Sequence, residues 1–202
     1  MSKLLKTVGA AIGVFALLLP SGAGALEIGS GHSITKLTGH AEVHGPNLGV
    51  GAIFSTGSGE LELKIDTRNR EIRYRLTYDF PDAGNTTTVG AQFVNQAHFH
   101  FGQEHTTGGI TVWLCKGDNV PSDAAVAAAT PMCPSPSGTV EGSILAGQVL
   151  ALAGQGLPGG EDGFDALLRA LQAGAIYANV HTDRFPPGEI RGQVRLNQGR
   201  NN

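Results

Sequence analysis

The sequence predicts an all-β protein, a sandwich or barrel of short antiparallel strands with one short helix. The composition favours turns, with 30 glycines and 10 prolines among 202 residues and only 15% charged residues. From residue 33 to residue 197, apolar and polar side chains mostly alternate with a period of two, which is typical of half-buried strands. Glycine and proline separate the alternating segments, so each strand is expected to be short and to end in a turn.

Residues 1–25 have the pattern of a secretory signal peptide. Lys3 and Lys6 form the charged start, residues 8–19 form an apolar run, and Ala23-Gly-Ala25 is a small-residue cleavage site. A membrane-spanning helix needs roughly 20 apolar residues, which is more than this run offers, and no later stretch comes closer. We therefore expect no membrane span and a product exported to the periplasm or secreted.

The remainder of the chain is expected to form one domain over residues 26–197, followed by a disordered tail at residues 198–202. The net charge is −3. The arginines are scattered along the chain and do not cluster, whereas phosphate recognition concentrates basic side chains on one face. Nucleic acid is therefore not expected as a partner.

The first half of the alternating region predicts four strands. Two are expected over residues 34–43 and 50–55. The next two, over residues 59–66 and 71–79, place Leu, Ile and Tyr on one face and mostly charged residues on the other. Because residues 67–70 form a short polar connection, these two strands are expected to pair as an antiparallel hairpin with facing charges outside.

The second half predicts the helix and five further strands. The helix is expected over residues 164–173, where a phenylalanine and three leucines fall on one helical face. Asp162 is available to cap its start, and Gly174 stands where a left-handed stop is expected. The strands are expected over residues 93–101, 109–115, 139–145, 175–181 and 189–196.

Cys115 and Cys133 are the two cysteines of the chain. In an exported protein an even cysteine count indicates a disulfide bond, so we expect these two residues to be joined. The bond would close a polar, alanine-rich loop of nearly twenty residues and stabilise the fold by about 3 kcal/mol. The pair lacks the close spacing of a redox-active Cys-x-x-Cys site, which argues for a structural role.

Three histidines are the strongest indication of chemistry. His98 and His100 are two residues apart in a predicted strand, so both imidazoles point to the same face. Neutral imidazole is a common ligand for zinc and copper, and these two rings supply two of the three or four donors needed. His181 is the candidate third ligand, and His105 a possible fourth. The alternative is that the rings are structural and hydrogen-bond to backbone or carboxylate groups.

A second polar group comprises His40, Glu42 and His44, which alternate with apolar residues. A solvated strand edge is the favoured interpretation. The alternative is a bidentate ion pair between Glu42 and Arg191, both of which are expected in strands.

The turn Pro186-Pro187-Gly188 is expected to connect the last two strands, because proline presets φ and glycine tolerates positive φ. Glu189 and Arg191 would share one strand face after the turn, and Asn179 before it can bond local backbone. The favoured role for these residues is to lock the hairpin.

The motifs of common enzymes are missing. The chain has no Gly-x-Ser-x-Gly sequence, no phosphate-binding glycine loop and no His-Glu-x-x-His sequence. This absence argues against the usual hydrolases and nucleotide-dependent enzymes.

Three of these segments resemble motifs of the CHRD domain, a module named after chordin and found in exported microbial proteins. They are Leu37-Thr-Gly-His-Ala-Glu-Val43, Ala97-His-Phe-His-Phe-Gly102 and the stretch from Tyr177 to Gln193. The resemblance implies an all-β, immunoglobulin-like or Greek-key sandwich of antiparallel strands. It also implies an extracellular setting, since in chordin the module belongs to a secreted growth-factor antagonist.

The chain also shows a fainter similarity to copper-zinc superoxide dismutase, which would imply a dismutase-like sandwich with His98, His100 and His181 as copper ligands. A zinc-binding loop with a bridging histidine and a later aspartate ligand are missing. Our favoured hypothesis is therefore an exported, non-enzymatic CHRD module with a copper or zinc site. The alternatives are an extracellular protein-interaction or structural module without metal, and a copper redox enzyme of dismutase type.

Overall fold

A computed structural model describes residues 31–44, 51–81 and 94–197. The predicted signal peptide at residues 1–25 and the predicted tail at residues 198–202 lie outside the described residues. Eight strands form one sheet in the order β5-β4-β7-β8-β1-β2-β3-β6, and every pair of neighbours is antiparallel. This arrangement confirms the all-β prediction.

The strands are β1 (Gly31–Thr38), β2 (Ser58–Asp66), β3 (Glu71–Asp79), β4 (Val94–Phe101), β5 (Gly109–Lys116), β6 (Gly138–Leu145), β7 (Ile176–Thr182) and β8 (Ile190–Gln193). The α-helices are α1 (Ala124–Ala129) and α2 (Gly160–Gln172), and the short 3-10 helices are η1 (Gly39–Ala41), η4 (Ala146–Gln148) and η5 (Ala153–Gln155).

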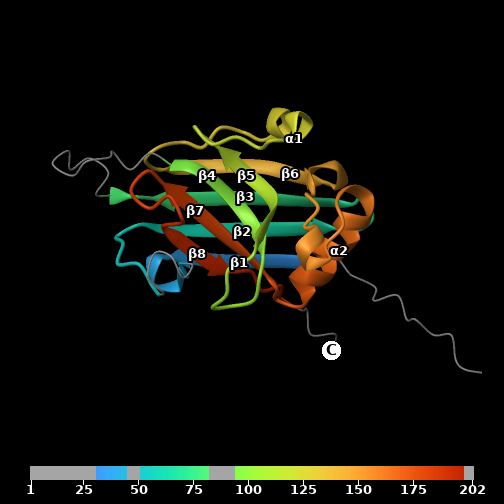
Figure 1. Cartoon of the computed structure of the whole chain (residues 1–202), viewed down its shortest axis with the longest axis horizontal. Helices are drawn as coiled ribbons and strands as arrows, with labels where there is room; N and C mark the ends of the chain where they lie inside the picture. Colours follow the sequence, from blue (N-terminus) through green and yellow to red (C-terminus); the bar gives the residue numbers. More distant parts are fainter. Residues whose placement is uncertain (1–30, 45–50, 82–93, 198–202) are drawn as a thin grey trace, which may run out of the picture.

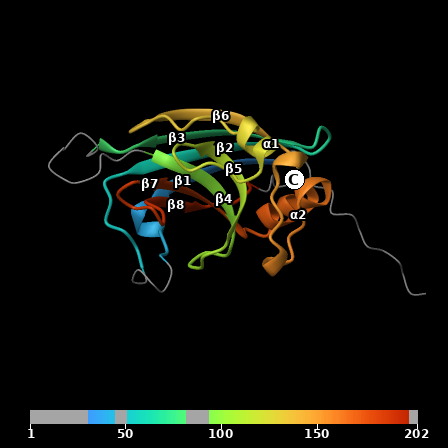
Figure 2. The ribbon, with the colours of Figure 1, turned by 45° about the horizontal axis from the view of Figure 1, so that its top comes forward.

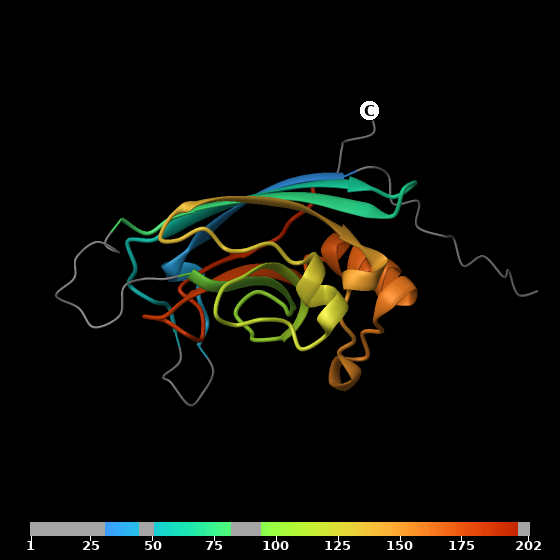
Figure 3. The same cartoon turned by 90° about the horizontal axis from the view of Figure 1, so that it is seen from above.

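The sheet folds over on itself where β1 meets β8, and their register joins only Thr38 to Arg191. On one side of this fold, β6, β3, β2 and β1 form one layer. On the other side, β5, β4, β7 and β8 cross it as a second layer (Figures 1 and 3). The apolar core lies between the two layers, because the inward residues of both are buried.

The connections have Greek-key character. β3 and β6 are neighbours although β4 and β5 separate them in the chain, and β4 and β7 are neighbours although β5 and β6 separate them. The chain therefore passes repeatedly from one layer to the other. The observed fold is the antiparallel sandwich that the sequence and the CHRD resemblance implied.

The predicted hairpin of β2 and β3 is confirmed. Leu61 faces Leu76 in the register, and all of the alternating leucine and isoleucine side chains of both strands are buried. On the outer face, Glu62 faces Arg75, so opposite charges meet across the strands. The tight turn is made possible by Arg70, whose φ of 52° lies in the left-handed region.

The first two predicted strands, over residues 34–43 and 50–55, differ from the structure. The strand expected over residues 34–43 ends at Thr38 and continues as η1, and residues 51–55 form no strand. Their link to η1 is one backbone bond from Ile53 N to the Gly39 oxygen, 2.8 Å long. A Cβ at Gly39 would lie 2.5 Å from the oxygen of Ile53, so only glycine permits this close crossing.

The last strand is shorter than expected, ending at Gln193 and not at residue 196. Val194 N still donates to the Ile176 oxygen of β7 at 2.9 Å, and the chain then reaches β1, where Asn197 N donates to the His32 oxygen at 3.0 Å. Ser33 Oγ donates to the oxygen of Arg195 at 2.7 Å, which holds the same crossing.

The predicted helix is present as α2, which lies at one end of the two layers (Figure 2). Its apolar face is buried in the core, as the pattern indicated. The helix begins at Gly160, so Asp162 lies inside the first turn and does not cap it. Gly174 adopts φ 65° immediately beyond its end, as expected for a stop.

A disulfide bond joins Cys115 and Cys133, as expected. Residues 131–133 run beside the end of β5, where Cys133 N donates to the Lys116 oxygen at 2.7 Å. Within the loop, Asp123 caps the six-residue helix α1, which was not predicted from the sequence, by accepting from the amides of Ala125 and Val126. Across the part of the chain that the structure describes, no helix combines the length and apolarity required to span a membrane.

Candidate metal centre

The candidate site lies on the outer face of the β5-β4-β7-β8 layer. Along β4, Ala97 and Phe99 point into the core, so His98 and His100 point to the opposite side. All seven residues of β7 are buried, which means that this outer face is covered as well as the inner one. The outward residues of β7 are Tyr177, Asn179 and His181.

Two connecting segments contribute to the cover. The loop between β4 and β5, residues 102–108, reaches the first histidine pair, where the His100 Nδ1 and the Gly108 oxygen are 2.9 Å apart. The hairpin between β7 and β8 reaches the third histidine, whose Nδ1 is 2.8 Å from the Pro186 oxygen. Each of these two rings therefore has one nitrogen oriented by a backbone carbonyl.

Strand pairing brings His98, His100 and His181 together. Asn179 faces His98 and Gln96 faces His181 in the register of β4 and β7, so His181 lies diagonally from His98. The ring centroid of His98 is 5.0 Å from that of His100 and 4.6 Å from that of His181. One ligand nitrogen from each ring lies within 4.8 Å of the other two.

The hydrogen bonds define which nitrogens are free to bind a metal. A carbonyl oxygen only accepts, so His100 and His181 carry their protons on Nδ1 and keep a lone pair on Nε2. The His98 Nδ1 is 3.1 Å from the His100 Nε2, and therefore donates to it. The Nε2 atoms of His98 and His181 are buried without a hydrogen-bond partner. A ring oriented by a backbone carbonyl with a free second nitrogen, as in His181, is typical of a metal ligand, and the second nitrogen of His100 becomes free when the hydrogen bond from His98 opens.

Burial keeps all three rings neutral. Desolvation lowers the pKa of His100 to about 4 and that of His181 to about 4. The pKa of His98 lies well below its ordinary value, mainly through burial and also through repulsion by the other two rings. Neutral imidazole is the form that coordinates metals, so at neutral pH no proton competes for these ligand atoms.

Two aromatic side chains flank the histidines. The Trp113 ring contacts that of His98 edge-on, with centroids 4.7 Å apart. Tyr177 stacks on His100 with the two planes only 4° from parallel, and its hydroxyl accepts from the Gly108 amide at 3.1 Å. Together they fix the orientation of the His-x-His pair.

Arg191 fastens the 102–108 loop over this site. Its guanidinium carbon lies 3.5 Å from the Tyr177 ring centroid, and its nitrogens donate to the oxygens of Thr106 at 2.8 Å and Gln103 at 3.0 Å. Gln193 donates to the Gly102 oxygen at 3.0 Å, which adds a second attachment. The loop is thus held by β8 at three of its residues.

Glu42 lies neither on a solvated strand edge nor in a bidentate ion pair with Arg191, the two arrangements expected from the sequence. It is buried, so the group that it forms with His40 and His44 is not a solvated strand edge. It accepts hydrogen bonds from Asn179 Nδ2 and from the Val43 amide, whereas Arg191 is engaged by the loop carbonyls. Burial raises the pKa of Glu42, although the positive charge of Arg191 acts in the opposite direction.

The hairpin residues pack closely beside this network. Gly188 has φ 131°, and a Cβ there would lie 2.6 Å from Asn179 Oδ1 and 2.7 Å from Glu42 Oε2. His44 Nε2 is 3.0 Å from the Gly188 oxygen. The carboxylate of Glu189 accepts hydrogen bonds from the hydroxyls of Ser55 and Thr182, which ties the hairpin to the 51–57 segment.

His105, the possible fourth ligand, is not part of the three-histidine group. It is exposed in the 102–108 loop, with a left-handed backbone of φ 65°. Within the described residues, the group therefore offers three protein donors. Trp113, Tyr177 and the loop-binding role of Arg191 were not foreseen, although the alternation of Tyr177 with Asn179 and His181 is a signal that places all three on one face.

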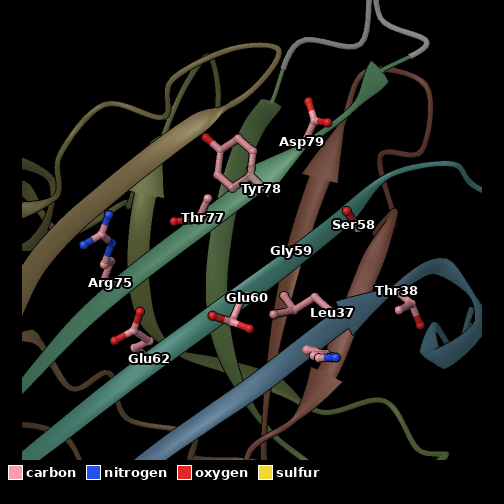
Figure 4. A pocket seen from close by; sticks show the side chains of 11 residues that line it. Leu37, Thr38, Ser58, Gly59, Glu60, Glu62, Arg75, Thr77, Tyr78 and Asp79 are labelled. Carbon is pink, nitrogen blue, oxygen red and sulfur yellow. The ribbon is translucent and has the colours of Figure 1, made fainter.

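The outer face of the other layer differs in kind. It is open and carries a hollow lined from β1, β2 and β3, in which Glu60, Glu62 and Arg75 stand on the surface (Figure 4). Opposite charges are interspersed, and Arg75 lies 3.6 Å from Glu141. A mixed, exposed face of this kind is typical of a solvated sheet surface.

The fold and the site define a disulfide-bonded β-sandwich domain with a buried histidine group under the loops of one layer. The chain belongs to the CHRD domain family, whose model matches residues 34–194. This range includes all three histidines and reaches from β1 to the end of β8. No curated protein and no solved structure gives a significant match, so the fainter likeness to a dismutase gains no support from these comparisons.

Proposed function

We propose that the protein is an extracellular, non-enzymatic binding module that holds one copper or zinc ion at His98, His100 and His181. The observation that carries this proposal is the convergence of three buried, neutral imidazoles whose ligand nitrogens lie within 4.8 Å of one another. Buried polar atoms are normally hydrogen-bonded, so two unpartnered ring nitrogens in one group call for a ligand.

The spacing of the donors supports the same conclusion. Two nitrogens that are each about 2.0–2.1 Å from one ion lie roughly 3.0–3.6 Å apart at ordinary bond angles. The ligand nitrogens of the three histidines lie within 4.8 Å of one another, and the hydrogen bond from the His98 Nδ1 to the His100 Nε2 must open as these two rings turn toward the ion. His181 completes a three-sided set from the neighbouring strand, and a small rotation of its ring closes the remaining distance.

The compartment is supported by independent features. The disulfide between Cys115 and Cys133 fits an oxidising environment, and CHRD domains are typically extracellular. The signal-like pattern of residues 1–25 adds secretion or periplasmic export to the proposal.

The test is a metal titration followed by the fluorescence of Trp113, the single tryptophan of the chain. Its ring touches His98, so copper bound at the site should quench its emission at one equivalent. His100→Ala should abolish this quenching and remove copper or zinc from the protein by elemental analysis. His105→Ala, which changes an exposed histidine of the adjacent loop, is the matched control and should behave like the wild type. Unchanged metal affinity in His100→Ala would exclude the site.

A structural role for the histidines is the second candidate, and the His98–His100 hydrogen bond favours it. In that case the module binds an extracellular protein or serves as a scaffold, and the rings only pack. The protein would then be free of metal when purified from its own compartment. His181→Ala would lose stability without losing any bound ion.

A copper redox enzyme of dismutase type would use the same three ligands. Its test is superoxide consumption by the copper-loaded protein. A rate no faster than that of the same concentration of free copper would exclude it.

A further inference from the structure

The geometry points to a selective site: we propose that the three histidines bind monovalent copper, Cu(I), in preference to the divalent ions Zn(II) and Cu(II). The inference rests on the proposed function, because it requires a metal ion at these three residues. Three features of the site carry it, namely the number of donors, their enclosure and the charges around them.

The number of donors suits a three-coordinate ion. Among the described residues, His98, His100 and His181 form the group without a fourth histidine, cysteine or carboxylate. Zn(II) is almost always four-coordinate in proteins, and a three-histidine zinc site completes its shell with water or hydroxide. Cu(I) has a filled d shell and is stable with three nitrogen donors in a plane, so it needs no further ligand.

The enclosure of the rings leaves a solvent ligand poorly supported. His98 is fully buried and the other two histidines are no more than 8% exposed. Trp113 and Tyr177 present apolar ring surface to the three histidines. Asn179 faces His98 across the strands, and its Nδ2 already donates a hydrogen bond to Glu42. A buried water needs two to four polar partners, whereas these neighbours offer a zinc-bound water one unpartnered acceptor, the Asn179 Oδ1.

The charges around the site favour a monovalent ion over a divalent one. All three donors are neutral. The nearby carboxylates are held elsewhere, since Glu42 accepts from Asn179 and Val43 while Glu189 accepts from Ser55 and Thr182.

The positive charge of Arg191 acts on His100 from behind the Tyr177 ring. The cost of burying an ion rises with the square of its charge, and repulsion by Arg191 rises in proportion to it. A divalent ion therefore meets about four times the burial cost and twice the repulsion that Cu(I) meets.

The first experiment measures three affinities on the purified protein. Copper(I) is titrated without oxygen, under ascorbate, against bicinchoninate, and Zn(II) and Cu(II) are titrated against chromogenic chelators of matched strength. We expect Kd for Cu(I) to be lower than for either divalent ion by at least about 100-fold. A tenfold excess of Zn(II) should fail to displace Cu(I), as read from the Trp113 emission and from elemental analysis after gel filtration.

A pair of variants tests the electrostatic cause. In the double variant Asn179→Asp with Glu42→Gln, the hydrogen bond between the two residues is retained with donor and acceptor exchanged, and the total charge is conserved. The carboxylate moves to the residue that faces His98 across the strands. Zinc affinity should then rise at least about tenfold relative to Cu(I) affinity. Glu42→Gln alone is the control, and it should leave the preference for Cu(I) at least as strong as in the wild type.

The outcomes separate this inference from the proposed function. If neither copper nor zinc binds, the metal-site proposal itself is wrong. If zinc or Cu(II) binds the three histidines as tightly as Cu(I) does, the site is real and the inference about its selectivity is overturned. If Cu(I) is preferred but the double variant leaves the ratio unchanged, charge is not the cause of the preference and the electrostatic argument fails.

Discussion

At the scale of single residues, the site is built from side chains whose second bond is made by the backbone. His100 and His181 each use Nδ1 to bond a carbonyl, at Gly108 and Pro186 respectively, so the fold orients their Nε2 atoms. Desolvation, the largest influence on the pKa of each of the three histidines, keeps the rings unprotonated. These two effects together turn ordinary strand histidines into candidate ligands.

The depressed pKa values of these histidines predict that the metal-free protein loses stability in mild acid. Unfolded histidine takes up a proton near pH 6.5, whereas His100 and His181 do so only near pH 4 in the folded state. Between these values the unfolded state binds more protons, so the free energy of unfolding falls as the pH falls. The slope is about 1.4 kcal/mol per pH unit for each histidine.

Urea unfolding at pH 7, 6 and 5 measures this slope. His181→Gln should reduce it, and His105→Gln, at an exposed position, should not. A free energy of unfolding that stays constant between pH 7 and pH 5 would contradict the prediction.

Gly188→Ala is expected to destabilise the hairpin beyond the usual effect of strain. The residue has φ 131°, and the added methyl group would meet Asn179 and Glu42. We expect a loss of roughly 2–4 kcal/mol in the free energy of unfolding. Gly156→Ala is the matched control, because Gly156 also has positive φ but nothing lies within 4 Å of its Cβ position. Equal losses in the two variants, measured by chemical denaturation, would show that the contacts at Gly188 do not matter.

At the scale of elements, β8 connects the site to its cover. One strand face carries Arg191 and Gln193, and both side chains hold the 102–108 loop through its backbone carbonyls. The same loop carries the Gly108 oxygen that orients His100. Hydrogen bonds therefore hold the loop, β8 and the histidine pair together, although β8 follows the loop by more than eighty residues in the chain.

This connection predicts different effects for two arginines that reach the same loop. Arg191→Met removes a buried guanidinium and its hydrogen bonds to the oxygens of Gln103 and Thr106, of which the Gln103 oxygen still accepts from Thr106, with an expected loss of roughly 2–4 kcal/mol. Arg195→Met removes an exposed ion pair to Glu104 and should cost no more than about 0.5 kcal/mol. Thermal unfolding gives the stabilities, and limited proteolysis shows whether the loop opens. Comparable cleavage of the loop in both variants would contradict the role of Arg191.

At the scale of the whole molecule, the outer faces of the two layers differ: one is exposed to solvent, and the other holds the candidate metal site. The inner faces of both layers form the apolar core, and the outer face of the β6-β3-β2-β1 layer is exposed and charged. The outer face of the second layer is buried under loops and holds the histidines, so metal binding is predicted to join β4 to β7 and to stabilise the whole domain.

The expected result is a rise in the melting temperature on loading with copper. An ion that binds only the folded state, present at a free concentration about a hundredfold above Kd, adds about 2.7 kcal/mol to the free energy of unfolding. Differential scanning calorimetry with and without copper measures the shift, and His100→Ala should remove it. A melting temperature that does not respond to copper or zinc would contradict metal binding by the folded state.

The sequence by itself determined most of the strands, the buried face of α2, the disulfide and the His-x-His pair, because each depends on a local pattern or on the cysteine count. Alternation over a few residues specifies a strand and its inward face, and it does not depend on distant parts of the chain. The strand predicted over residues 50–55 was wrong for the described residues 51–55 for this reason: their pattern is that of a strand, but beside the crossing at Gly39 they join no strand ladder, and one hydrogen bond is their backbone link to η1.

Only the tertiary structure decided that His181 lies beside the pair, that His105 does not, and that Glu42 is buried on Asn179 and not paired with Arg191. These facts depend on the register of β4 against β7 and on the path of loops across the outer face. Such contacts join residues far apart in the chain. Their geometry follows from how the two layers pack, and no period or spacing in the sequence encodes it.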